Sequence, residues 1–163
     1  MPAEKKGAKR KILLGYTGIW PREALEAPEL RKEVEAKLGQ PGVYVLYRDE
    51  VPFYVGQAAK TLWRRLYSHA MNPVDTYYFL WNFFSAFKVP GNHIDEAEAM
   101  LIAAVPAANS SKPKIEPIKL SRPARNALKA IRLRRTGLSK EQLPGALKAD
   151  EEAADEGEDD TAE

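Results

Sequence analysis

The most informative stretch of this chain reads GVYVLYRDEVPFYVGQ and covers residues 42–57. Apolar and aromatic residues alternate on both sides of a short charged segment, residues 48–52, and this pattern is typical of a β-hairpin. A turn centred on Asp49 would place Tyr44 and Tyr54 opposite each other on one face of the hairpin. A shifted turn would misalign the two side chains, so the predicted pair depends on the register.

A helix is expected over residues 62–71, because apolar residues recur there at helical spacing and Thr61 can cap the first turn. Arg65 and His69 lie four residues apart and would emerge together from the polar side of this helix. An arginine and a histidine on one exposed helix are usually solvated side chains, so this pair alone does not indicate a functional site.

Residues 83–89 are typical of a third strand, and a second helix is expected to open at Asp95 and run through Ala104. Glu98 lies in the first turn of that helix. Its carboxylate could belong to a functional site, or it could complete a capping box by reaching back to the amide of Asp95.

Taken in this order, residues 41–113 resemble the GIY-YIG nuclease family. The two motifs that name the family resemble residues 42–44 (GVY) and residues 54–57 (YVGQ), with valine in place of isoleucine at both middle positions. Valine keeps a β-branched side chain there. The four other characteristic side chains of the family resemble Arg65, His69, Glu98 and Asn109. The segment before Asn109 is shorter than in repair-type members, which leaves Ser110 as an alternative, and the chain resembles the restriction-enzyme-like branch more than the repair branch.

The resemblance implies an α+β domain in which a small three-stranded antiparallel sheet is flanked by helices. It implies a divalent-metal-dependent DNA endonuclease, with Mg²⁺ or Mn²⁺ held by Glu98. Waters and substrate oxygens would complete the coordination of this hard cation. The expected catalytic residues are Tyr44, Tyr54, Arg65, His69, Glu98 and Asn109.

Each of these residues has an expected role in phosphodiester hydrolysis. The planar guanidinium of Arg65 would bind the scissile phosphate through two parallel hydrogen bonds. Tyr44 would act as the base with His69 receiving the proton, or Tyr44 would orient a water that His69 deprotonates. Tyr54 would donate a hydrogen bond to the phosphate. Asn109 would orient a reacting group, or it would only cap the chain after a proline.

Restriction-type double-strand cleavage is the expected reaction, by a homodimer because one site per chain must cut two strands. Structure-specific repair cleavage, mobile-element cleavage and single-strand cleavage are open alternatives. The rival from another class is a non-catalytic nucleic-acid-binding module with the same fold. Intact Tyr44, Arg65, His69 and Glu98 argue against it, because binding alone does not require them.

Charge is distributed unevenly along the chain. Residues 149–163 hold nine acidic side chains and no basic ones, so the other 148 residues carry 25 Lys and Arg against 14 Asp and Glu, a net charge of +11. A basic body favours a polyanionic partner such as DNA. A basic helix with an apolar stripe beside it is expected after residue 120, where it could dock by one face or remain solvated. The residues expected to contact nucleic acid are Arg64, Arg122, Arg125, Lys129 and Arg132.

The chain has no cysteine, which excludes disulfides and thiolate metal sites and is compatible with a cytoplasmic location. No apolar stretch has the length of a membrane span, so no membrane partner is expected. The expected organisation is a basic flexible tail at 1–11, an N-terminal helical extension at 12–40, the catalytic core at 41–113, a basic helical extension at 114–148 and a disordered acidic tail at 149–163. Within the extension at 12–40, helix is expected over residues 21–38 with a break near Pro28. The aromatic residues between positions 77 and 87 are expected to pack in the core rather than to stack on bases.

Overall fold

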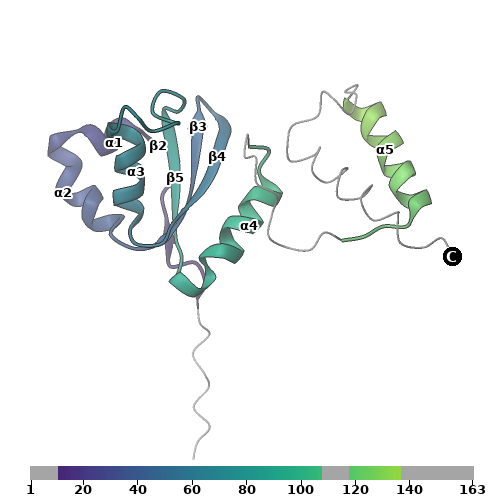
Figure 1. The fold of residues 1–163 in the computed structure, drawn as a ribbon, viewed down its shortest axis with the longest axis horizontal. Helices are drawn as coiled ribbons and strands as arrows, with labels where there is room; N and C mark the ends of the chain where they lie inside the picture. Colours follow the sequence, from purple (N-terminus) through teal and green to yellow (C-terminus); the bar gives the residue numbers. More distant parts are fainter. Residues whose placement is uncertain (1–10, 108–117, 137–163) are drawn as a thin grey trace, which may run out of the picture.

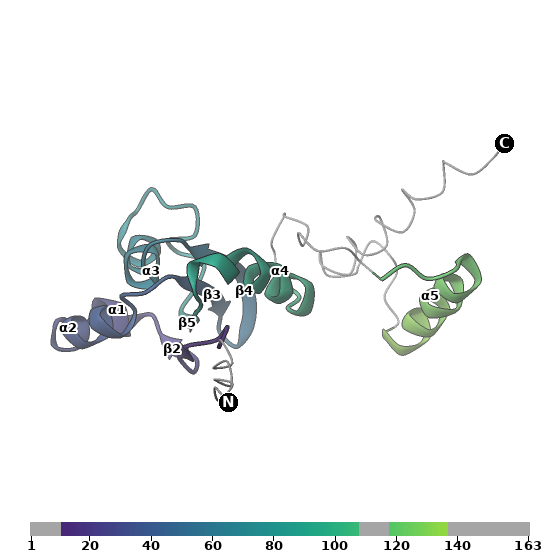
Figure 2. The same cartoon turned by 90° about the horizontal axis from the view of Figure 1, so that it is seen from below.

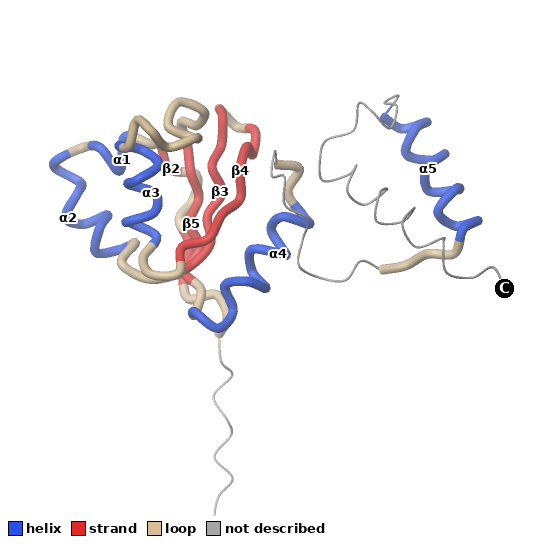
Figure 3. Tube along the Cα trace, in the orientation of Figure 1, coloured by secondary structure: helices blue, strands red, loops and turns tan. Residues whose placement is uncertain are grey.

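The computed structural model describes residues 11–107 and 118–136 of the chain. The protein has the expected α+β fold, with helices on both sides of one antiparallel sheet, as Figures 1 and 3 show. The strands are β1 (Gly15–Tyr16), β2 (Trp20–Pro21), β3 (Gly42–Arg48), β4 (Val51–Ala58) and β5 (Phe83–Lys88). The helices are α1 (Glu23–Glu26), α2 (Pro28–Lys37), α3 (Leu62–Met71), the short 3₁₀ turn η1 (Gly91–His93), α4 (Ile94–Ala104) and α5 (Arg122–Thr136).

The sheet has five strands, and the expectation of three strands is wrong. β3 lies between β4 and β5, while β1 and β2 both pair with β5. Each of these two extra strands is two residues long, which is too short to produce an alternating pattern in the sequence. Together with Thr17, whose hydroxyl accepts a hydrogen bond from the amide of Ala86 at 2.9 Å, they satisfy backbone groups of β5 that an open edge would leave unpaired. The first part of the expected helical extension therefore belongs to the sheet.

The hairpin forms as expected, but the predicted register is wrong. Tyr44 lies opposite Gly56, and Tyr54 lies opposite Leu46. The pairing shifts beyond Leu46, so that Phe53 has no partner in the register, and Asp49 adopts a left-handed conformation with φ of 56°. This bulge next to a short turn moves the pairing by two residues in total. Because a shift by two positions preserves the face of each side chain, both tyrosines still lie on one side of the sheet.

Two apolar layers fill the spaces above and below the sheet. On one side, α1, α2 and α3 pack against residues such as Leu46 and Phe84, and on the other side α4 packs against Val43 and Val45. Figure 2 shows α1, α2 and α3 grouped away from α4, with the sheet between them. The helix predicted over residues 21–38 is present as α1 and α2, although Pro21 belongs to β2. The break expected near Pro28 lies at the extended Ala27, and Pro28 begins α2.

α4 starts earlier than the sequence predicted. Its N-cap is His93, which makes no side-chain cap hydrogen bond, because η1 continues directly into the helix. Glu96 therefore occupies the third helical position, and the capping-box interpretation of Glu98 is wrong. Glu98 lies in the second turn of the helix instead.

The basic segment after residue 120 forms the expected helix, α5. Two residues of its apolar stripe, Leu128 and Ile131, are 45% and 47% exposed, and Figures 1 and 2 show α5 apart from the sheet. The stripe is thus not buried against the described parts of the core. No described helix is both long enough and apolar enough to cross a lipid bilayer.

Candidate active site

α3 carries two of the predicted site residues, and it forms where the sequence places it. The hydroxyl of Thr61 accepts a hydrogen bond from the amide of Arg64 at 3.2 Å, which caps the first turn. Arg65 is exposed, as expected, whereas His69 is only 1% exposed and points into the protein. The expectation that both side chains emerge on the polar side is therefore wrong for His69. The histidine is buried because it binds a side chain of the sheet.

That partner is Tyr44 on β3. The phenol oxygen of Tyr44 lies 2.7 Å from Nε2 of His69, and the Nε atom of Arg65 donates to the same oxygen at 3.3 Å. On the other side of the imidazole, Nδ1 of His69 lies 2.9 Å from both carboxylate oxygens of Asp75. An ionised carboxylate only accepts hydrogen bonds, so Nδ1 carries the proton and Nε2 accepts the proton of the phenol. The four side chains form a continuous hydrogen-bonded path.

Burial determines the protonation states along this path. Burial raises the pKa of Tyr44 well above 10, although Arg65 acts in the opposite direction. Burial also lowers the pKa of His69 below 6.5, against the opposing effect of Asp75. Burial alone would raise the pKa of Asp75, but its hydrogen bonds with His69 and with the amide of Tyr77 outweigh burial and lower it. At neutral pH the path therefore holds a neutral phenol, a neutral imidazole and a carboxylate.

Asp75 is the site residue that the sequence analysis missed. It lies in the turn after α3, where its amide donates to the carbonyl of Asn72 at 3.0 Å and its carboxylate accepts from the amide of Tyr77 at 2.9 Å. The available signal is an acidic residue in a proline-containing turn six positions after His69. No regular element relates the two positions, so their contact does not follow from helical or strand periodicity.

Tyr54 lies beside this path on the edge strand β4. Its ring is 6.3 Å from the ring of Tyr44 and stacks on Tyr77 at 4.3 Å, with 29° between the ring planes. Burial raises the pKa of Tyr54, and the neighbouring Tyr77 and the carboxylate of Glu98 raise it further. Tyr54 is thus a neutral hydrogen-bond donor at neutral pH.

Gly56 explains how two tyrosines fit into so small a space. A Cβ atom at this position would lie 2.5 Å from the phenol oxygen of Tyr44 and 2.7 Å from Cε1 of Tyr54. Both distances are shorter than real Cβ contacts. The missing side chain of Gly56 therefore makes room for the Tyr44 phenol, which lies across the backbone of β4.

Glu98 is the predicted metal ligand. It is partly exposed on α4, which packs along β4 and β3, and its charge acts on the pKa of Tyr54, so the two side chains lie within electrostatic range. The described residues contain no group of three or more His, Cys, Asp or Glu side chains that could enclose a metal. A single carboxylate fits an ion that retains most of its water shell, as Mg²⁺ does, and does not fit an ion that needs a complete protein cage.

The structure thus brings Tyr44, Arg65 and His69 into direct contact and places Tyr54 beside them. Asn109 and its alternative Ser110 lie outside the described residues. Of the residues expected to contact nucleic acid, Arg64 is exposed on α3, Arg122 is exposed and Arg125 partly exposed on α5, and Lys129 and Arg132 belong to the same helix.

The arrangement can move a proton from the phenol oxygen of Tyr44 to an imidazole that a carboxylate holds in one tautomer. It also offers an exposed guanidinium within 3.3 Å of the same oxygen, which is suited to an anionic group. Comparison with protein-family models, with curated proteins and with solved structures finds no match.

Proposed function

We propose that this protein is a divalent-metal-dependent DNA endonuclease with a GIY-YIG-like catalytic domain. The observation that carries the proposal is the path from Arg65 through the Tyr44 phenol and His69 to Asp75. Tyr44 and His69 are buried between the sheet and α3, and Asp75 is largely buried in the turn after α3. Burial of such polar groups is unfavourable unless they are hydrogen-bonded. A surface that only binds nucleic acid does not need a proton acceptor, whereas hydrolysis of a phosphodiester needs a group that takes a proton from the attacking water, and this path offers one.

Arg65 is the residue that binds the scissile phosphate in this proposal. Its side chain is exposed, so it can reach a substrate, and it remains charged at every physiological pH. A guanidinium makes two parallel charge-assisted hydrogen bonds to a phosphate, whereas a lysine acts only as a point charge. The net charge of +11 outside the last 15 residues supports a polyanionic substrate.

Tyr44 and His69 act together to activate the attacking water. The phenol is neutral, so it can take a proton from water only while it passes its own proton to Nε2 of His69. The neutral imidazole accepts that proton, and Asp75 stabilises the resulting imidazolium. The hydroxide forms a new bond to phosphorus as the bond to the leaving oxygen breaks, and the leaving oxygen takes a proton from solvent.

This relay is supported over direct deprotonation of water by His69. The imidazole is only 1% exposed, and its Nε2 atom is already bonded to the phenol. Tyr44 is itself fully buried, so water reaches its oxygen only after a neighbouring side chain moves. Arg65 is the exposed neighbour bonded to that oxygen. We infer that pairing of Arg65 with a phosphate draws the guanidinium away and opens the phenol to water.

Glu98 would hold the Mg²⁺ or Mn²⁺ ion, with waters and phosphate oxygens as the other ligands. When bound, the ion neutralises charge that develops on the phosphate and on the leaving oxygen. Tyr54 contributes a neutral phenol that donates a hydrogen bond to the same phosphate. Restriction-type double-strand cleavage by a dimer is the finer form of the proposal, because each chain carries one such site.

The test is a cleavage assay with supercoiled plasmid and with single-stranded DNA, in Mg²⁺, in Mn²⁺ and in chelator. We expect metal-dependent nicking that is lost in Glu98→Ala and Arg65→Ala. Glu96→Ala is the matched control on α4, because this carboxylate is exposed and should leave the rate unchanged. Arg64→Ala should weaken binding in a salt-dependent way and leave the single-turnover rate at saturation unchanged.

DNA binding by the wild type without cleavage under any of these conditions would contradict the proposal and would favour the non-catalytic binding module. Tyr44→Phe tests the mechanism separately, because it removes only the phenol oxygen. A rate close to that of the wild type in this variant would exclude Tyr44 as the proton carrier.

A further inference from the structure

Large apolar side chains are exposed on the segment between α3 and β5, residues 72–81, which we call the 72–81 segment. Val74 is 88% exposed and Phe79 is 83% exposed, and Met71 just before the segment is 46% exposed. The expectation that Phe79 packs in the core is therefore wrong. Single exposed apolar residues are common on protein surfaces, whereas several on one short segment favour an interaction surface.

The 72–81 segment is held in place by a series of hydrogen bonds. Its backbone forms successive turns. The amide of Tyr78 donates to the carbonyl of Asp75 at 3.1 Å, and the amide of Leu80 donates to the carbonyl of Tyr77 at 3.0 Å. Arg22 also donates to the carbonyls of Tyr78 and Ala70 and lies over the ring of Tyr78 at 4.9 Å. The exposed side chains are thus presented from a fixed backbone, and little conformational freedom remains to be lost on binding.

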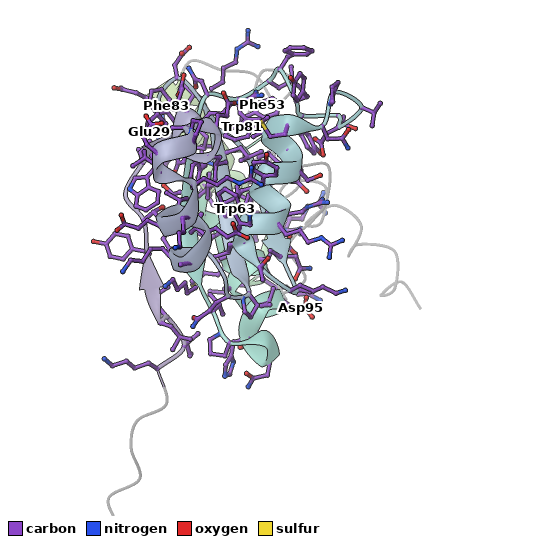
Figure 4. All side chains as sticks on the ribbon, turned by 90° about the vertical axis from the view of Figure 1, so that its left-hand side faces the viewer. Glu29, Phe53, Trp63, Trp81, Phe83 and Asp95 are labelled. Carbon is purple, nitrogen blue, oxygen red and sulfur yellow. The ribbon has the colours of Figure 1, made fainter. Side chains whose placement is uncertain are left out.

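The same segment contributes to the candidate active site. Asp75 binds His69, and Tyr77 stacks on Tyr54, so these two side chains point inward while Val74 and Phe79 point outward. Phe53 contacts Tyr77 edge to face with ring centres 6.2 Å apart, and Figure 4 shows Phe53 at the same end of the domain as Trp81, the last residue of the segment. The segment that exposes Phe79 is therefore the one that supplies Asp75 and Tyr77 to the candidate active site.

Charge on this part of the chain favours nucleic acid as the partner. Lys60, Arg64 and Arg65 are all exposed, and they lie on α3 or just before it. The 72–81 segment has a single acidic residue, Asp75, and that carboxylate is bound to His69. Arg65 lies close enough to Asp75 to lower the pKa of that carboxylate, so an exposed guanidinium adjoins the segment that exposes Phe79. An exposed aromatic ring and a nearby cation offer stacking to bases and an ionic contact to a phosphate, which is the combination that single-stranded or distorted DNA requires.

We propose that Phe79 contacts a nucleobase of the substrate, and that the enzyme acts on DNA in which a base next to the scissile phosphate is unstacked. This inference rests on the proposed function and specifies its substrate class. An aromatic side chain that stacks on a base contributes to affinity for any base, so the contact selects the state of the DNA rather than its sequence. Loss of such a contact reduces affinity by about tenfold or more.

The test compares the affinity of the full-length protein for a single-stranded oligonucleotide and for an abasic oligonucleotide of the same length, in chelator so that cleavage does not occur. The wild type should prefer the oligonucleotide with bases by about tenfold. Phe79→Ala should lose this preference and retain its affinity for the abasic strand, while Phe79→Trp should keep the preference. Tyr16→Ala is the matched control, because Tyr16 is a 72% exposed aromatic residue on β1, at the sheet edge away from β4.

An unchanged preference for bases in Phe79→Ala would overturn the inference, and an equal loss in Tyr16→Ala would overturn it as well. Self-association that Phe79→Ala abolishes, measured by analytical ultracentrifugation without a change in DNA affinity, would assign the segment to a protein contact and also overturn it. Because binding is measured without metal, these outcomes do not depend on whether the wild type cleaves DNA. Failure of the inference and failure of the proposed nuclease activity are therefore distinguishable.

Discussion

Replacement of Gly56 by alanine should displace the Tyr44 phenol and thereby interrupt the proton path. The new methyl group would lie 2.5 Å from the phenol oxygen and 2.6 Å from Cζ of the same ring, whereas ordinary contacts begin at 3.4 Å. The ring must therefore move by about 0.9 Å, the difference between these contacts. A shift of that size would stretch the 2.7 Å hydrogen bond to His69 beyond a useful length. Overpacking of this kind costs about 1–3 kcal/mol of stability.

Two measurements check this prediction. Thermal unfolding should show the loss of stability, and single-turnover cleavage should fall by about 100-fold, because a misplacement of about 1 Å in a reacting group has an effect of that order. Gly18→Ala is the control, since no atom lies within 4 Å of the Cβ position there. The stability loss from Gly56→Ala should become smaller in a Tyr44→Phe background, which lacks the nearest atom. Wild-type stability and rate in Gly56→Ala would refute the close approach of Tyr44 to β4.

Three further predictions concern the residues around His69. Asp75→Asn should lower the cleavage rate at neutral pH by about 10²–10⁴-fold, because the tautomer is no longer fixed. The acidic limb of its pH-rate profile should move to lower pH, since Asp75 raises the pKa of His69. The free energy of unfolding should fall as the pH drops below 6.5, because burial lowers the pKa of His69 in the folded state and the unfolded chain is protonated first. Urea denaturation should show this fall in the wild type, and a smaller fall in His69→Gln would confirm the assignment. Arg22→Ala should reduce stability by about 2–4 kcal/mol in thermal unfolding, and Arg22→Lys should restore only part of it, because a lysine cannot make both carbonyl bonds with the same geometry.

The parts of the fold that follow from local periodicity could be predicted from the sequence. The hairpin, α3 with its Thr61 cap, and β5 all appear where their residue patterns place them. β1 and β2 could not be predicted, because they exist only through pairing with β5 and are too short to have a pattern of their own. The register of the hairpin also depends on the left-handed Asp49 and on the unpaired Phe53, and neither is visible as an alternation of apolar and polar residues.

The residues of the candidate site could also be predicted only in part from the sequence. Tyr44, Arg65 and His69 meet as the sequence predicted, even though the register between the tyrosines was wrong, because the error of two residues preserved the face. The burial of His69 could not be derived from α3 alone, since helical spacing places it near the polar residue Arg65. Asp75 was missed because its contact with His69 depends on the path of an irregular turn. The sequence pattern therefore identified the residues on regular elements, and the structure added the residue from the turn that completes the path.

The 72–81 segment contains both Asp75, which contacts His69, and Phe79, which is proposed to contact a nucleobase. Asp75 points inward and fixes the tautomer of His69, while Phe79 points outward four residues later, and the turn bonds between them leave little freedom for one to move without the other. A substrate that pushes against Phe79 would therefore also act on Asp75. If so, Phe79→Ala should lower affinity and also slow cleavage at saturating DNA, whereas Arg64→Ala should change affinity alone. If Phe79 contributes only to binding, Phe79→Ala will lower the affinity and leave the cleavage rate at saturating DNA unchanged, as Arg64→Ala does. A lower rate in Phe79→Ala alone therefore indicates that the segment couples binding to catalysis.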